Sequence, residues 1–178
     1  MEEKVRSTTV QGIYFGLATG AGLIILSLIL FLSDLYMNKW LSAIGYLILI
    51  SGMVYGTLEY RKNFTNGFMT YGQTFTMLFK VGLFAGLVAA IYSFVFAQFI
   101  HPGFVQEILE QSRQQMVEQN PNMTEEQLEM GLSWAAKFTS PIAMMVLGFL
   151  TYLLVSAVIG LIAAIFLKKE DPALNQKM

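Results

Sequence analysis

The distribution of charge along the chain is the feature that most constrains its fold. Four stretches contain no Asp, Glu, Lys or Arg: residues 7–33, 40–58, 81–100 and 138–167, with 27, 19, 20 and 30 residues. At about 1.5 Å per residue, each is long enough as a helix to cross a hydrocarbon layer of about 30 Å. The chain is 55% hydrophobic and only 13% charged, which is typical of membrane proteins. We therefore predict an integral membrane protein.

The composition also excludes several kinds of chemistry. A net charge of −1 without a basic cluster argues against nucleic acid as a partner. The absence of cysteine and the presence of one histidine exclude disulfides, thiolate metal sites and multi-histidine sites. We find no phosphate-binding glycine loop, no catalytic serine or zinc motif, and no pair of carboxylates within the apolar stretches. We therefore expect no enzyme activity, no cofactor and no metal.

The apolar stretches predict an all-α fold, a bundle of four transmembrane helices within one domain of residues 1–178. The expected spans are approximately residues 12–33, 40–58, 78–100 and 141–167, and residues 101–137 form the loop between the third and the fourth. The loop carries two amphipathic patterns separated by the helix-breaking residues 120–122. Thr124 with Gln127 three residues later forms a capping box, which predicts the start of the second loop helix.

The basic residues indicate the orientation in the membrane. With four spans, both termini lie on one side, and that side holds eight Lys and Arg residues against three on the other: Lys4, Arg6, Arg61, Lys62, Lys80, Lys168, Lys169 and Lys177 against Lys39, Arg113 and Lys137. Cytoplasmic segments are the ones enriched in Lys and Arg. We therefore expect both termini in the cytoplasm and the loop of residues 101–137 outside it.

Small residues recur every four positions in all four spans. In lipid, where no hydrophobic force drives helices together, such rows allow close backbone approach. We interpret the pattern as packing within one chain rather than as a homodimer interface. The candidate helix-packing residues are Gly12, Gly16, Gly20, Gly52, Gly56, Gly82, Gly86 and Gly160.

The segment of residues 64–80 has an aromatic residue every three or four positions, which predicts a helix along its whole length. Such a helix would lie in the membrane interface or form the first turns of a long third span. Lys80 is the one ionisable group that a long third span would draw into the membrane, and we expect its ammonium to reach the headgroups. The candidate interfacial or interaction residues are Phe68, Tyr71, Gln73, Phe75, Lys80 and His101.

Residues 60–64 (YRKNF) and 67–75 (GFMTYGQTF) resemble the hallmark of a bacterial membrane family known as domain of unknown function (DUF) 4199. The resemblance extends over most of the chain, from the first pair of spans to the lysine-rich end of the fourth. It implies a multi-pass protein of the bacterial cytoplasmic (inner) membrane. It brings no assigned activity, substrate or catalytic residue.

Two functions are compatible with these patterns. The first is a non-enzymatic structural or regulatory component of the cell envelope, whose partners are the lipid bilayer and either a second copy or another envelope protein. The alternative is a small permease or channel built by oligomerisation. A transport pathway requires polar residues that face inward near mid-bilayer. Here such residues are few and scattered: Thr19, Ser27, Ser93, Thr151 and Ser156. The sequence therefore favours the first function.

Overall fold

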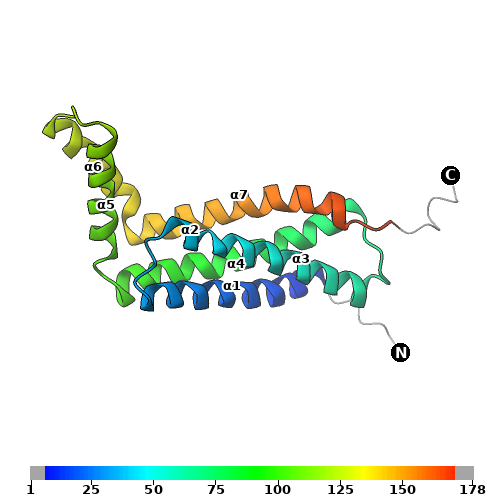
Figure 1. The fold of residues 1–178 in the computed structure, drawn as a ribbon. Coiled ribbons are helices and arrows are strands. Elements are labelled where there is room, and N and C mark those ends of the chain that lie inside the picture. Colours follow the sequence, from blue (N-terminus) through cyan, green and yellow to red (C-terminus); the bar gives the residue numbers. More distant parts are fainter. Residues whose placement is uncertain (1–6, 171–178) are drawn as a thin grey trace. The chain divides into compact units, whose positions relative to one another are not determined.

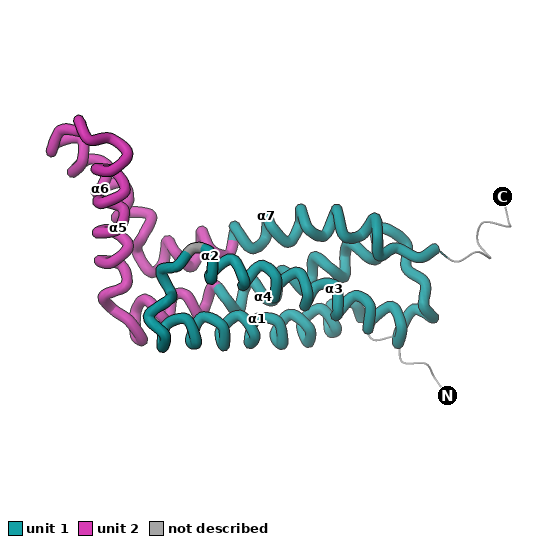
Figure 2. Tube along the Cα trace, viewed as in Figure 1, with its two compact units in different colours: residues 1–89, 150–178 teal, residues 90–149 magenta. Residues whose placement is uncertain are grey.

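The computed structural model describes residues 7–170, and over these residues the fold is helical without a named strand. The elements (Figure 1) are α1 (Thr8–Leu32), α2 (Lys39–Ser42), α3 (Ile44–Phe64), α4 (Tyr71–Val95), the π-helix η1 (Phe96–Ile100), α5 (Phe104–Gln119), α6 (Glu125–Thr139) and α7 (Pro141–Leu167). The predicted all-α fold is confirmed. The described residues divide into two compact units (Figure 2): unit 1 holds the residues up to 89 and from 150 onward, and unit 2 holds residues 90–149.

Within residues 7–170, four helical segments are long and apolar enough to cross a membrane: Thr8–Leu32, Trp40–Phe64, Tyr71–Ile100 and Pro141–Leu167. The prediction of four spans is therefore confirmed, but three boundaries differ. The first span begins near Thr8, the second continues six residues beyond 58, and the third begins seven residues before 78. The second was predicted too short because Glu59, Arg61 and Lys62 were taken as its end, although they occupy the last turns of the same helix.

The expectation of a continuous helix from residue 64 to residue 80 is wrong for residues 65–70. The chain leaves the helix after Phe64, and Asn66 and Gly67 have positive φ angles of 51° and 82°. A capping box starts α4, because the Thr70 N–H donates to Gln73 Oε1 over 3.0 Å and the Gln73 N–H to Thr70 Oγ1 over 3.4 Å. From Tyr71 onward the segment belongs to a long third span, as the second interpretation proposed.

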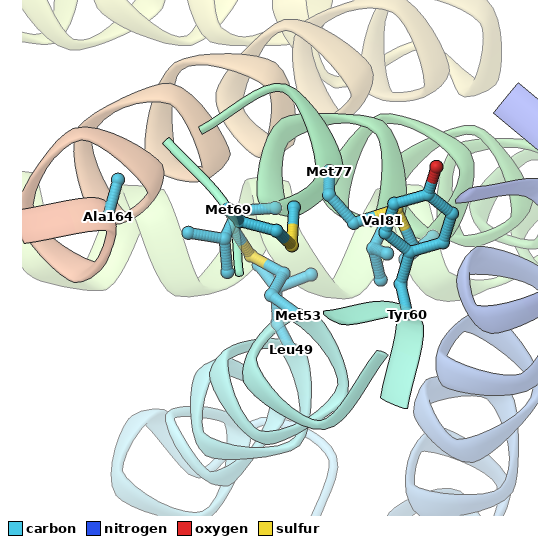
Figure 3. Packing of buried hydrophobic residues seen from close by; sticks show 9 residues of the cluster. Leu49, Met53, Tyr60, Met69, Met77, Val81 and Ala164 are labelled. Carbon is cyan, nitrogen blue, oxygen red and sulfur yellow. The ribbon is translucent and has the colours of Figure 1, made fainter. Parts of the chain in front are cut away.

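The core of unit 1 is formed by aliphatic and thioether side chains together with the ring of Tyr60 (Figure 3). Leu49 and Met53 of α3 meet Met77, Leu78 and Val81 of α4, and all five are fully buried. The fully buried face of α4 therefore carries Met, Leu and Val at helical spacing. The aromatic residues Phe75 and Phe79 beside them are only partly buried.

Helices α1 and α4 pack in parallel through a row of glycines. A Cβ placed on Gly12, Gly16 or Gly20 would meet the side chain of Lys80, Phe84 or Val88 respectively. Both rows advance by four residues in the same direction, so each glycine accepts one side chain of the facing helix. This matched spacing fixes the register of the two helices.

The other candidate glycines of unit 1 lie between helices that run antiparallel to each other. Gly52 and Gly56 of α3 face Thr19 and Phe15 of α1, whereas Gly82 and Gly86 of α4 face Ser156 and Tyr152 of α7. Gly160 of α7 faces Phe75 and Leu78 of α4. All eight candidate glycines therefore lie where an added Cβ would meet a side chain of another helix. The resulting directions are those of four consecutive membrane crossings.

Unit 2 contains the connection between the third and the fourth span. The π-helix closes the end of α4, and the His101 N–H donates to the Phe96 carbonyl over 2.8 Å. Helices α5 and α6 form a hairpin in which Gly131 faces Met116, with 3.1 Å from an added Cβ to Met116 Sδ. The predicted pair of helices and the capping box at Thr124 and Gln127 are confirmed.

Candidate functional site

The turn of residues 65–70 is joined to the end of α7 by a short antiparallel backbone bridge. The Met69 N–H donates to the Lys169 carbonyl over 2.8 Å, and the Lys169 N–H donates to the Met69 carbonyl over 2.9 Å. Arg61 Nη1 donates to the Leu167 carbonyl over 2.6 Å, which satisfies one of the carbonyls that the last turn of a helix leaves without a partner. We call this arrangement, Arg61 with residues 65–70 and 167–169, the clasp.

Side chains of residues 68–75 also contact α7 and the residues that follow it. The Tyr71 hydroxyl donates to the Leu161 carbonyl over 3.2 Å, and Lys169 Nζ lies 5.5 Å from the centre of the Phe68 ring. Phe75 fills the space beside Gly160. Phe68, Tyr71 and Phe75, three of the six candidate interaction residues, therefore contact α7 or the residue pair that follows it, and another candidate, Gln73, caps α4.

Lys80 extends along α1 toward the start of that helix. Its stem crosses α1 at Gly12, where an added Cβ would lie 2.7 Å from Lys80 Cβ. The ammonium donates to Thr8 Oγ1 over 2.7 Å and to Thr9 Oγ1 over 2.8 Å. Because both hydroxyls belong to the first turn of α1, the charge lies at the level of a helix end, while the apolar stem lies deeper.

His101 follows the π-helix in unit 2, at the corner before α5. Its Nε2 lies 3.0 Å from Glu107 Oε1, and its ring lies beside those of Phe96 and Phe104, with centroid distances of 6.1 and 6.2 Å. Within the described part of the chain, no three His, Cys, Asp or Glu side chains come close enough to hold a metal ion. His101 therefore links the end of η1, which it caps, to Glu107 in the first turn of α5.

An exposed apolar row lies on α6 in unit 2, and it includes Trp134 and Phe138, which we expect from the sequence at the level of the outer headgroups. Met130, Trp134 and Phe138 are spaced by four residues and are 59%, 56% and 56% exposed. The rings of Trp134 and Phe138 stack with centroids 6.4 Å apart, and Lys137 Nζ lies 4.5 Å from the centre of the Trp134 ring. We call these three residues the α6 stripe. Their four-residue spacing places all three on one helix face.

The buried polar side chains of the spans are uncharged, and several bond to their own helix. The hydroxyls of Thr19, Thr57 and Thr74 donate to the carbonyls four residues earlier, over 2.7, 2.8 and 2.9 Å. Such bonds satisfy a hydroxyl within apolar surroundings and leave it little capacity to coordinate a passing solute. The buried Ser156 hydroxyl lies against Gly82 in a close helix contact.

Within residues 7–170, four apolar spans and an apolar interior define a multi-pass, all-α membrane protein. A family model matches residues 14–169, and the chain belongs to the family described as "Protein of unknown function (DUF4199)", as the resemblance in residues 60–75 predicted. The comparisons with curated proteins and with solved structures gave no match.

Proposed function

We propose that this protein is a non-enzymatic component of the bacterial cell envelope, with a structural or regulatory role, which binds another envelope protein through the α6 stripe. In this proposal it resides in the cytoplasmic membrane with both termini inside. The observation that carries the proposal is the exposure of Met130, Trp134 and Phe138 on one face of α6.

The surroundings of the stripe support a protein partner. Residues 104–139 contain six glutamates and two basic residues, so the hairpin that carries the stripe is acidic. Protein interfaces commonly combine buried aromatic anchors with a polar rim. None of the described residues of α5 is fully buried, which leaves the hairpin open to a partner over much of its surface.

The interior of unit 1 supports a role other than transport. Its core residues are mostly aliphatic or thioether side chains, and the hydroxyls of the buried threonines Thr19, Thr57 and Thr74 bond to their own helices. The only lysine within the apolar part of the third span, Lys80, is directed to the first turn of α1. A polar path through the single chain would need polar groups that face one another instead.

Site-specific photo-crosslinking in native membranes tests the proposal. A photoreactive residue in place of Trp134 is expected to give one discrete adduct with another protein, and the same residue in place of the exposed Glu126 serves as the control. The double substitution Met130→Ala with Trp134→Ala is expected to abolish the association, whereas Glu126→Gln retains it. Adducts at position 134 formed with lipid alone, or with a second copy alone, would refute the proposed envelope partner.

A further inference from the structure

The clasp brings together basic residues from the ends of two spans. Arg61 belongs to the last turn of α3, and Lys169 lies two residues beyond the end of α7. The bond from Arg61 to the Leu167 carbonyl and the backbone bridge between Met69 and Lys169 hold the two segments side by side. At 3.8 Å per peptide unit, the Cα atoms of Leu167 and Lys169 are at most about 7.6 Å apart. The two cationic side chains therefore leave the same small area of unit 1.

The charge of Arg61 is half-buried and has no carboxylate partner among residues 7–170. Glu59 lies two residues earlier, a spacing at which helix side chains do not face each other, and its carboxylate accepts from Asn63 Nδ2 over 2.7 Å. The Leu167 carbonyl offers Arg61 only a partial negative charge. A positive charge that is withdrawn from water is stabilised by a nearby anion. The clasp therefore presents a guanidinium that remains open to an anionic ligand.

Lys169 supplies a second cation at this place. Its ammonium lies 5.5 Å from the centre of the Phe68 ring, and within the described part of the chain it has no carboxylate partner. The preceding residue differs in this respect, because Lys168 Nζ lies 3.2 Å from Glu170 Oε1. Of these two neighbouring lysines, only Lys168 is thus compensated by an acidic side chain.

The position of the clasp in the membrane indicates which anion is at hand. The clasp joins the ends of the second and fourth spans to the start of the third, and the ends of spans lie where the hydrocarbon meets the lipid headgroups. Lipid phosphates are the anions of this layer. The planar fork of arginine matches phosphate oxygens, and a lysine ammonium adds a second charge-assisted bond. Basic residues gathered between the ends of spans are typical binding sites for anionic headgroups.

A second copy of the chain does not supply the missing anion. In a chain that crosses the membrane four times, residues 101–137 lie on the side opposite to residues 65–70, so the glutamates of that loop in a copy of the same orientation do not reach the clasp. On the clasp side, the carboxylates of the described residues are those of Glu59 and Glu170. Both are already bonded within their own chain, to Asn63 and Lys168.

From this geometry, we propose that the clasp binds the phosphate of an anionic phospholipid. The guanidinium of Arg61 and the ammonium of Lys169 donate to the phosphate oxygens, and the acyl chains remain in the bilayer beside the bundle. This site is separate from the α6 stripe, which belongs to the other unit, so each proposal can fail without the other.

The experiment titrates the purified, delipidated full-length chain in detergent with phosphatidylglycerol or phosphatidylcholine of identical acyl chains and counts bound lipids by native mass spectrometry. We expect the unchanged chain to bind phosphatidylglycerol about fivefold or more tightly than phosphatidylcholine. Lys169→Gln removes the ammonium and leaves the backbone bridge in place. It should weaken binding of phosphatidylglycerol by about fivefold, the effect of one basic residue at an anionic surface, and leave phosphatidylcholine unchanged.

Lys168→Gln is the matched control, because it changes the net charge by the same amount at the neighbouring residue. We expect it to weaken binding of phosphatidylglycerol by less than about twofold, since Lys168 is paired with Glu170. Equal losses in the two variants would mean a diffuse attraction of the whole surface and would overturn the site.

Two further outcomes bear on the ligand and need no variant. Equal binding of the two lipids by the unchanged chain would overturn the proposal. Displacement of phosphatidylglycerol by an equal concentration of glycerol phosphate would overturn the lipid as the source of the phosphate, because a soluble phosphate would then be the ligand. We expect glycerol phosphate to compete only at a large excess, since it lacks the acyl chains that hold the lipid in the same layer as the clasp.

Discussion

Gly16 provides the sharpest test of how the spans are held together. A Cβ added at this position would contact Phe84 Cβ and would lie 3.0 Å from the Val81 carbonyl oxygen and 3.2 Å from the Ala85 amide nitrogen. Because two of these neighbours are backbone atoms of α4, a side-chain rotation cannot relieve the crowding. The substitution Gly16→Ala must therefore move α1 away from α4.

Overpacking of this kind costs about 1–3 kcal/mol of the free energy of unfolding. For a chain of this size, 1 kcal/mol corresponds to a change of about 2–4 °C in Tm, so we expect Gly16→Ala to melt about 2–12 °C lower. Gly148→Ala is the matched control, since its Cβ meets nothing within 4 Å and alanine favours a helix. Intrinsic tyrosine and tryptophan fluorescence during heating in detergent measures both. If Gly16→Ala melts at or above the temperature of Gly148→Ala, the α1–α4 seam is not a close contact and the argument fails.

Three further predictions concern the clasp and the orientation. Gly67→Ala should lower stability by about 1 kcal/mol through its φ of +82° alone, since its Cβ also meets no atom, whereas Gly72→Ala should not; thermal melting of the pair decides this. Arg61→Met should cost about 1.5–3 kcal/mol by removing a charged donor from the Leu167 carbonyl, and Arg61→Lys should recover part of the loss in the same assay. In a chain without native cysteine, Gln119→Cys should react with an impermeant thiol reagent in intact cells and Lys62→Cys only after permeabilisation; the reverse pattern would contradict cytoplasmic termini.

The capping boxes show how far local signals extend. Thr124 and Gln127 were predicted to start a helix because helix-breaking residues precede them, and the structure confirms this. The same Thr-x-x-Gln spacing at Thr70 and Gln73 was overlooked, because the aromatic period of residues 64–79 continues across the turn without a visible change of phase. Periodicity alone does not reveal a six-residue break when the side chains on either side keep the same spacing.

The partners of the spans depend on tertiary structure. The sequence predicts that Gly12, Gly16 and Gly20 line one face, but it contains no signal that this face meets Lys80, Phe84 and Val88. The clasp is harder still to predict from the sequence, because Met69 and Lys169 are far apart in the chain and neither belongs to a strand-forming pattern. Such pairings follow from the way in which whole helices pack.

The clasp also has a consequence for how the protein is made. Met69 is synthesised a hundred residues before Lys169. The N–H and C=O groups of Met69 therefore cannot form their hydrogen bonds to Lys169 until α7 has been translated and inserted. During that interval α1 and α3 can already pair through Gly52 and Gly56. The bridge between Met69 and Lys169 thus distinguishes a fully inserted chain from one arrested before its last span.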